Sequence, residues 1–168
     1  MRPEQGTHPE FYNNYIPKAK GENVMDAFSL NLMEIKSVLS EISPTKENFA
    51  YAPGKWTIKQ IVNHLIDTER IFAYRALRFA RKDPQQPLPF EEDHYAANAD
   101  VSGRSLNDLM EELEHVRMAN IYILKNFSKE TLMLSGKTTM GNATVLSIGY
   151  TICGHAAHHL NVIKEKYL

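Results

Sequence analysis

Four long runs of apolar residues at helical spacing constrain the fold of this chain more than any other feature of its sequence. Each run repeats an apolar side chain every three or four residues, which is the period of one face of an α-helix. We expect helices over about residues 24–42, 57–81, 105–126 and 144–167. Because such helices bury their apolar faces against one another, the four runs predict an all-α four-helix bundle.

The connections between these runs are also marked in the sequence. Ser43-Pro44 ends the first run. Thr57, three residues before Gln60, has the spacing of a capping box at the start of the second helix. Between the second and third helices, Lys82 to Gly103 lacks periodicity and contains three prolines. A connection of this length in a compact domain is usually functional or disordered, so we expect one long loop here.

Two shorter segments lie between the third and fourth helices. Residues 128–134 are expected to form a short extra helical turn. Residues 135–142 contain two glycines, Gly136 and Gly141, and are expected to form a loop.

Length and composition indicate a single domain with an N-terminal extension. The chain has 168 residues, which is long enough to bury a sizeable core. We expect residues 1–20, which contain three prolines, to be an extended arm on the domain formed by residues 21–168. Its apolar and aromatic side chains are available to pack on that domain: Phe11, Tyr12, Tyr15 and Ile16. No secretory signal or transmembrane stretch is visible. Together with the single Cys153, this predicts a cytoplasmic protein without a membrane partner.

The charge balance indicates which partners to expect. Nineteen basic residues against twenty acidic ones give a formal net charge of −1, and no arginine-rich stripe is present. A surface of this kind is not typical of a polyanion-binding protein. We therefore expect a small-molecule substrate and no nucleic acid partner.

Histidines form the clearest chemical pattern. His155 and His159 are four residues apart in the fourth helix, so they lie one turn apart on the same face. His64 lies close to the apolar face of the second helix and supplies a third nitrogen if these helices pack together. Imidazole is the commonest neutral metal ligand, and three protein ligands leave a position for water or substrate, as in catalytic zinc sites. His158 is expected at the rim of this site.

Further polar residues are candidates for the same site. Asp67 and Thr68 follow His64 by three and four residues and are expected to line its cavity. Asp67 is our candidate catalytic proton acceptor, although a purely structural role near the helix surface is the alternative. The acidic segment that contains His94 either covers the cavity mouth or is simply solvated.

The same residues resemble the DinB-like, YfiT-related metal-binding superfamily. The resemblance extends from about Val24 to the C-terminus and depends on these segments: Tyr51 to Gln60 leading to His64, Asp67 to Arg70, Tyr74-Arg75, Gly103 to Leu106, and Gly154 to Leu160. It implies a four-helix bundle in which His64, His155 and His159 hold a divalent metal ion. Zinc, nickel and iron remain open as its identity.

The resemblance also implies a function class. It implies frequent homodimers and a bacterial, cytoplasmic setting. Better-understood members are transferases that load a low-molecular-weight thiol onto an electrophile, or isomerases that use such a thiol. Others are described as metal-dependent hydrolases. We therefore expect a metal-dependent transferase or hydrolase, with thiol S-transfer as the leading hypothesis. Hydrolysis on the same triad and a non-catalytic metal- or ligand-binding bundle are the alternatives.

Overall fold

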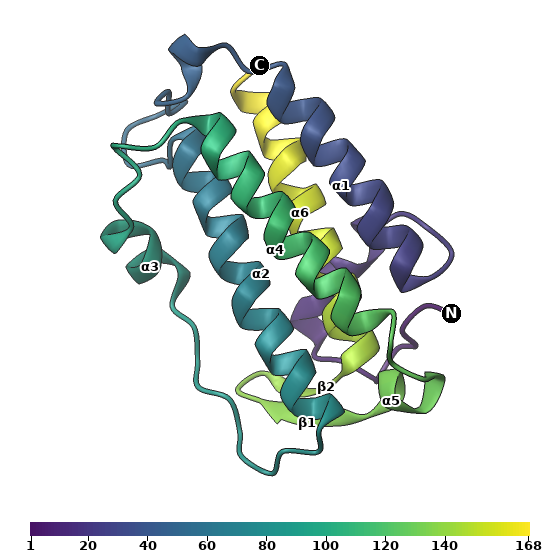
Figure 1. The fold of residues 1–168 in the computed structure, drawn as a ribbon. Helices are drawn as coiled ribbons and strands as arrows, with labels where there is room; N and C mark the ends of the chain where they lie inside the picture. Colours follow the sequence, from purple (N-terminus) through teal and green to yellow (C-terminus); the bar gives the residue numbers. More distant parts are fainter.

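The computed structural model describes residues 1–168 and confirms the all-α four-helix bundle (Figure 1). Each long helix begins and ends within two residues of the range that apolar periodicity predicts. None of the helices combines the length and the apolar character needed to cross a membrane. The long helices are α1 (Val24–Ser40), α2 (Ile58–Ala80), α4 (Leu106–Leu124) and α6 (Val145–Lys166).

Short polar side chains begin all four long helices. Asn23, Thr57, Ser105 and Thr144 each accept a hydrogen bond from a backbone amide of the first turn. The capping box at Thr57 is confirmed, because the Gln60 side chain in turn accepts from the Thr57 amide at 2.8 Å. Each such cap stabilises its helix by about 1 kcal/mol. The cap at Thr57 therefore helps to fix the register of α2, and with it the position of His64.

The bundle surrounds a long apolar core. Helix α2 packs against both α4 and α6, and α1 packs against the same two helices. Figure 1 shows α4 in front and α6 behind, with α1 and α2 on either side. Buried side chains form one apolar cluster around Phe28 and Ile148 and a second around Leu109 and Leu160. The histidines of α2 and α6 lie along this packed pair of helices.

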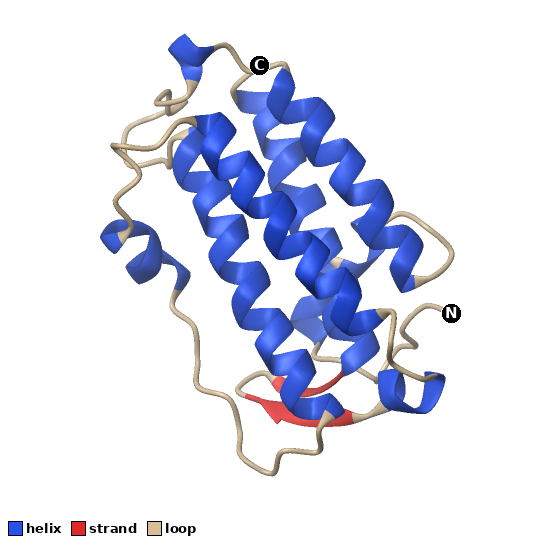
Figure 2. Ribbon diagram, viewed as in Figure 1, coloured by secondary structure: helices blue, strands red, loops and turns tan.

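The connections carry more regular structure than the sequence predicted (Figure 2). A short helix α3 (Glu92–Asn98) interrupts the long loop between α2 and α4, and the expected extra turn is α5 (Lys129–Met133). The expected glycine loop is instead an antiparallel hairpin of β1 (Ser135–Thr138) and β2 (Gly141–Thr144). Gly136 lets it approach α2, because a Cβ there would lie 2.2 Å from the Phe79 ring.

The N-terminal arm is folded rather than extended. It forms two 3₁₀ turns, η1 (Glu10–Asn14) and η2 (Ile16–Lys18), and buries Tyr12 and Ile16. Gly154 allows this close packing on α6, since a Cβ at that position would lie 2.0 Å from the carbonyl oxygen of Tyr15. The arm contributes to the apolar cluster around Phe28 and Ile148. The division at residue 20 stays a prediction.

Candidate metal centre

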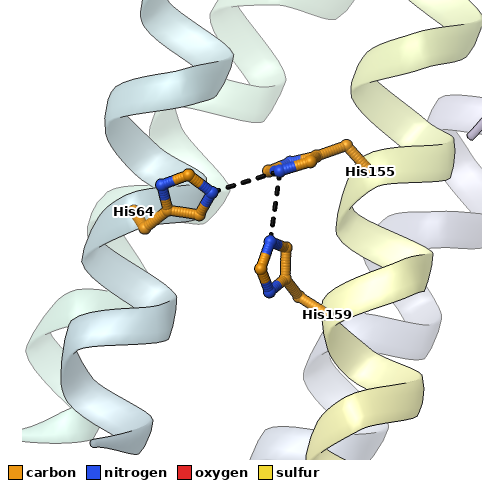
Figure 3. A group of neighbouring side chains, drawn as sticks. All are labelled: His64, His155 and His159. Carbon is orange, nitrogen blue, oxygen red and sulfur yellow. Dashed lines mark hydrogen bonds between the residues drawn. The ribbon is translucent and has the colours of Figure 1, made fainter. Parts of the chain in front are cut away.

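The structure brings together the three histidines that the sequence singles out. His64 points from α2 and His155 and His159 from α6 into the space between the two helices (Figure 3). The Nε2 atom of His155 lies 3.1 Å from Nε2 of His64 and 3.1 Å from Nε2 of His159. Three potential ligand atoms from two elements that are distant in sequence therefore converge.

Hydrogen bonding among the rings does not explain this convergence. An imidazole Nε2 carries either one hydrogen or one lone pair, so His155 Nε2 takes part in only one good hydrogen bond at a time. Both of its neighbours nevertheless lie at 3.1 Å. A cation between the three nitrogens satisfies all of them at once, because each ring then directs a lone pair to the same point.

The separation of the nitrogens fits a transition metal ion. Two nitrogens that each lie about 2.1 Å from one ion are about 3.0 Å apart for bonds at right angles and about 3.4 Å apart for tetrahedral bonds. The two observed distances of 3.1 Å lie between these values. The donor set is therefore compatible with a divalent ion that retains open coordination positions.

The protonation state of the rings also suits metal binding. Burial lowers the pKa of His64 to about 4 and that of His159 to about 3. Burial, followed by the neighbouring histidines, lowers the pKa of His155 well below its usual value. All three rings are therefore neutral at pH 7, and a neutral ring has a lone pair to offer. The Thr68 hydroxyl, 3.5 Å from Nδ1 of His64, is placed to accept the Nδ1–H that leaves Nε2 free.

A cavity of about 330 Å³ opens directly onto the three histidines. Its walls come from the N-terminal arm, the α2–α4 connection and the hairpin, as well as from α2 and α6. The Trp56 ring centroid lies 4.7 Å from that of His64, and the Tyr15 centroid lies 5.2 Å from that of His155. A cavity of this volume with aromatic walls accommodates a small molecule.

The other predicted site residues do not all reach this cavity. Thr68 lines it, but Asp67 does not. Asp67 accepts a hydrogen bond from Asn63 at 3.0 Å, and burial raises the pKa of its carboxyl group. The geometry therefore gives no support to Asp67 as the proton acceptor. Successive residues are about 100° apart on a helix, so Asp67 and Thr68 lie on opposite sides of the line through His64.

The remaining histidines of the sequence pattern lie at the edge of the site or outside it. His158 lines the cavity, half-buried, with its ring centroid 5.3 Å from that of His159, but it is not one of the converging donors. His94 lies on α3, exposed, where Asn98 contacts it. The carboxylates just before His94 line the cavity instead: Glu91, Glu92 and Asp93.

Several lining residues escaped the sequence analysis. Residues 138–140 of the hairpin line the cavity, and no local pattern indicated them. Arg75 of α2 also lines it; in the sequence this residue contributed only to the family resemblance and was given no role in the site. The aromatic residues of the arm were a partial signal, since their expected packing on the domain surface places Tyr15 against His155.

These features define a helical bundle with a candidate histidine metal centre between two of its long helices. The sequence model of the DinB superfamily matches residues 27–163, and the chain belongs to this superfamily. A protein of Geobacillus thermodenitrificans (strain NG80-2) named "Putative metal-dependent hydrolase" is 28% identical over 89 residues. That match covers 52% of this chain and 50% of the relative, so the chain spans about half the length of the curated protein it matches.

Two solved structures share the fold. YfiT from Bacillus subtilis, described as a probable metal-dependent hydrolase with an unusual four-helix bundle topology, superposes with a TM-score of 0.75 at 16% identity. The match covers 98% of this chain and 90% of YfiT. The colibactin self-resistance protein ClbS, in complex with dsDNA, gives a TM-score of 0.60 at 16% identity, with coverage of 84% and 94%.

The ClbS complex corrects one expectation from the sequence. The exclusion of nucleic acid as a partner is wrong, because a protein with this fold is found in complex with dsDNA. The physical reason is that a net charge of −1 sums over the whole surface. It says nothing about how charge is distributed locally, and local positive surface is what contacts phosphate groups.

Proposed function

We propose that this protein is a metal-dependent hydrolase whose divalent ion is held by His64, His155 and His159. The observation that carries the proposal is the convergence of three neutral imidazole nitrogens at the edge of an open cavity. The names of the Geobacillus relative and of YfiT support hydrolysis as the reaction class.

Residues around the three histidines have separate roles in such a site. When bound, a divalent ion lowers the pKa of a water or thiol ligand, so that a nucleophilic anion is available near neutral pH. Thr68 holds the His64 ring in the tautomer that frees Nε2. The rings of Trp56 and Phe90, with centroids 4.7 and 6.5 Å from that of His64, restrict water beside the ligands. The carboxylates of residues 91–93 are better candidates for the proton acceptor than Asp67, because they line the cavity and Asp67 does not.

A low-molecular-weight thiol is the second candidate nucleophile. The cavity is much larger than a water molecule and leaves room for a cosubstrate. Cys153 cannot serve as the thiol, because it is fully buried and burial raises its pKa to about 12. Thiol transfer therefore requires a thiol that enters from solution. We further propose that the protein is a homodimer in a bacterial cytoplasm. Light scattering tests the oligomeric state, and cell fractionation tests the location.

Metal analysis tests the ligand assignment. Protein purified without chelators is expected to contain about one divalent ion per chain by inductively coupled plasma mass spectrometry. His155→Ala is expected to contain almost none. His158→Ala is the matched control, since His158 lies three residues along the same helix and lines the same cavity without joining the cluster. Equal metal content in the two variants would contradict the assignment.

Activity assays then separate the two nucleophiles. The metal-loaded protein is assayed against ester and amide substrates without thiol, and against electrophiles with bacillithiol-like thiols or glutathione. Turnover without thiol that is lost in His155→Ala supports hydrolysis. Turnover only with thiol supports transfer. Full metal loading without any turnover, and without an exchangeable water ligand, would favour a non-catalytic binding bundle.

A further inference from the structure

We propose that Arg75 is an anion-binding residue of the cavity, and that the substrate is an elongated organic acid whose carboxylate binds Arg75 at the end remote from the histidines. The inference rests on the proposed function in one respect, since it takes the histidine end as the place of reaction. It adds the chemical class of the substrate and its orientation in the cavity.

Arg75 is a buried cation without a counter-charge. Arg75 and Arg117 are the two buried arginines, with 9% and 0% of their surfaces exposed. Arg117 pairs with both carboxylate oxygens of Glu69 at 2.7 and 2.8 Å. No carboxylate lies within 4.0 Å of the Arg75 guanidinium. A buried charge without a partner is costly, so its retention beside a cavity indicates a partner that arrives with the ligand.

Most of the Arg75 guanidinium remains available for that ligand. Its single hydrogen bond runs from Nη2 to the carbonyl oxygen of Leu88 at 2.9 Å. No fully buried side-chain nitrogen or oxygen in this protein lacks a hydrogen-bond partner. The other two nitrogens of Arg75 have no hydrogen-bond partner and therefore retain some accessible surface, and the residue lines the cavity. A guanidinium has five N–H donors in a planar fork that matches a carboxylate.

The surroundings of Arg75 strengthen binding of an anion. The guanidinium carbon lies 5.1 Å from the centroid of the Phe72 ring. Tyr12, on the same cavity, has its pKa raised to about 12 by burial and is a neutral phenol. Because only 9% of the Arg75 surface is exposed, a charge-assisted hydrogen bond to it is worth more than one at the protein surface.

Charge along the cavity gives the ligand a direction. The acidic residues 91–93 lie toward the histidines, since they directly follow Phe90, whose ring centroid lies 6.5 Å from that of His64. When no metal ion is bound to the histidines, this negative charge disfavours an anion at that end. The anionic group of the ligand is therefore expected at the Arg75 end, where a single guanidinium matches a single carboxylate in charge and geometry.

Helix geometry gives an approximate ligand length. Arg75 is eleven residues beyond His64, which corresponds to about 16 Å along α2. Long helical side chains lean toward the N-terminus, and the contact of Arg75 with Phe72 agrees with this. The guanidinium is therefore on the order of 10 Å from the histidine end, which an extended chain of about eight atoms spans.

Binding of a matched pair of small probes tests the proposal. Hexanoate and its uncharged counterpart hexanamide are titrated against the protein as purified and again after chelator treatment. Affinity is followed by the arginine Nε–H signals in ¹H–¹⁵N spectra. Wild-type protein is expected to bind hexanoate roughly 10- to 100-fold more tightly than hexanamide, the range of a charged hydrogen bond. Equal affinities for the two probes would overturn the proposal without reference to any variant.

Variants assign the preference to Arg75. In chelator-treated protein, where no ion can bind the carboxylate, Arg75→Gln is expected to lose the preference for hexanoate, and Arg75→Lys to retain part of it. Arg78→Gln is the matched control, because Arg78 lies one turn further on the same helix, pairs with Asp83 and does not line the cavity. Retention of the full preference in Arg75→Gln, with a native circular dichroism spectrum, would contradict the assignment. Hexyl phosphate that binds through Arg75 when hexanoate does not would overturn the choice of a carboxylate.

The chelator-treated arm separates this inference from the proposed function. A preference for hexanoate without metal supports the role of Arg75 even if no ion binds the histidines. Stoichiometric metal together with no preference overturns the anion site alone.

Discussion

Helix α2 carries two buried polar clusters, five residues apart, and they differ in how their polar atoms are satisfied. Glu69 and Arg117 form a two-pronged ion pair between α2 and α4. Asn31 of α1 accepts from the guanidinium at 2.8 Å, and Asn120 donates to the Glu69 carboxylate at 3.2 Å. The charges of this cluster cancel, and side chains of the protein meet its main hydrogen-bonding needs.

The histidine cluster lies on the other side of α2 and borders a cavity, whereas the ion pair is enclosed by side chains of the protein. His64 lies about 140° around the helix from Glu69 and faces α6 instead of α4. Its cluster has three converging nitrogens, no carboxylate partner and a cavity at its edge. The difference teaches that burial alone does not identify a functional site. A polar network whose hydrogen bonds are all made within the protein holds helices together. A set of converging nitrogen atoms without such partners indicates that a ligand binds there.

Breaking the ion pair is expected to give the largest loss of stability. Glu69→Gln leaves the Arg117 guanidinium buried with its charge uncompensated, so we expect the free energy of unfolding to fall by about 3–5 kcal/mol. Urea denaturation measures this change. Glu112→Gln is the control, because Glu112 pairs with Arg70 and Arg104 at a more exposed position, where an ion pair is worth about 1 kcal/mol or less. Similar losses in both variants would remove the distinction.

Metal binding to the histidine cluster is also expected to change the free energy of unfolding. A ligand at 100 times its dissociation constant stabilises the native state by about 2.7 kcal/mol. Added zinc is therefore expected to raise the unfolding free energy of wild-type protein by about this amount at that excess. His155→Ala should show no such gain, and Glu69→Gln should retain it. A zinc effect that persists in His155→Ala would mean that the ion binds elsewhere.

The metal-free histidine cluster is expected to lose stability in mild acid. The pKa values of His64 and His159 are lowered in the folded state to about 4 and about 3, from about 6.5 in the unfolded chain. Below pH 6.5 the unfolded state therefore binds more protons, so stability falls as pH falls and the loss ends below the folded values.

Between pH 6.5 and 5.5 these two rings together contribute a loss of about 2 kcal/mol. Urea titrations of chelator-treated protein at both pH values measure it. His64→Gln should reduce the loss, while His115→Gln, at an exposed position on α4, should not. An identical loss in all three proteins would show that other groups control the acid response.

The smallest expected effect concerns the hydroxyl beside His64. Thr68→Val keeps the side-chain shape but removes the oxygen 3.5 Å from Nδ1 of His64. We expect about tenfold weaker metal binding, the lower end of the range for residues that orient a ligand. Competition with a chromophoric chelator measures it, and the metal-free stability serves as the internal control. Unchanged metal affinity would show that the His64 tautomer is set without Thr68.

The helices and the histidine cluster were predictable because their signals are local or nearly so. Apolar spacing located α1, α2, α4 and α6, and the spacing of His155 and His159 placed both on one face. The meeting with His64 followed from the packing of two helices in one bundle. Resemblance to a known family supported the same three residues.

The parts that were missed depend on contacts between distant segments. The arm was expected to be extended, but it folds against α6 because Gly154 leaves space for the Tyr15 carbonyl. The hairpin of residues 135–144 has no apolar alternation, so it carried no strand signal. Arg75 is buried without an ion-pair partner because no carboxylate lies near it in space. No spacing along the chain reveals such an absence. Asp67 was expected to line the cavity together with Thr68 but does not, because successive helix positions lie about 100° apart around the helix axis.

The walls of the cavity come largely from segments outside the bundle. The three histidines stand on α2 and α6, whereas the arm, the α2–α4 connection and the hairpin enclose much of the space in front of them. Apart from Arg75, which lies on α2 with His64, much of the surface that contacts a ligand is thus encoded in stretches of chain other than those that hold the histidines. Substitution of the cavity-facing side chains of these segments can therefore change which molecules are admitted, while the helices that present the imidazoles are left intact.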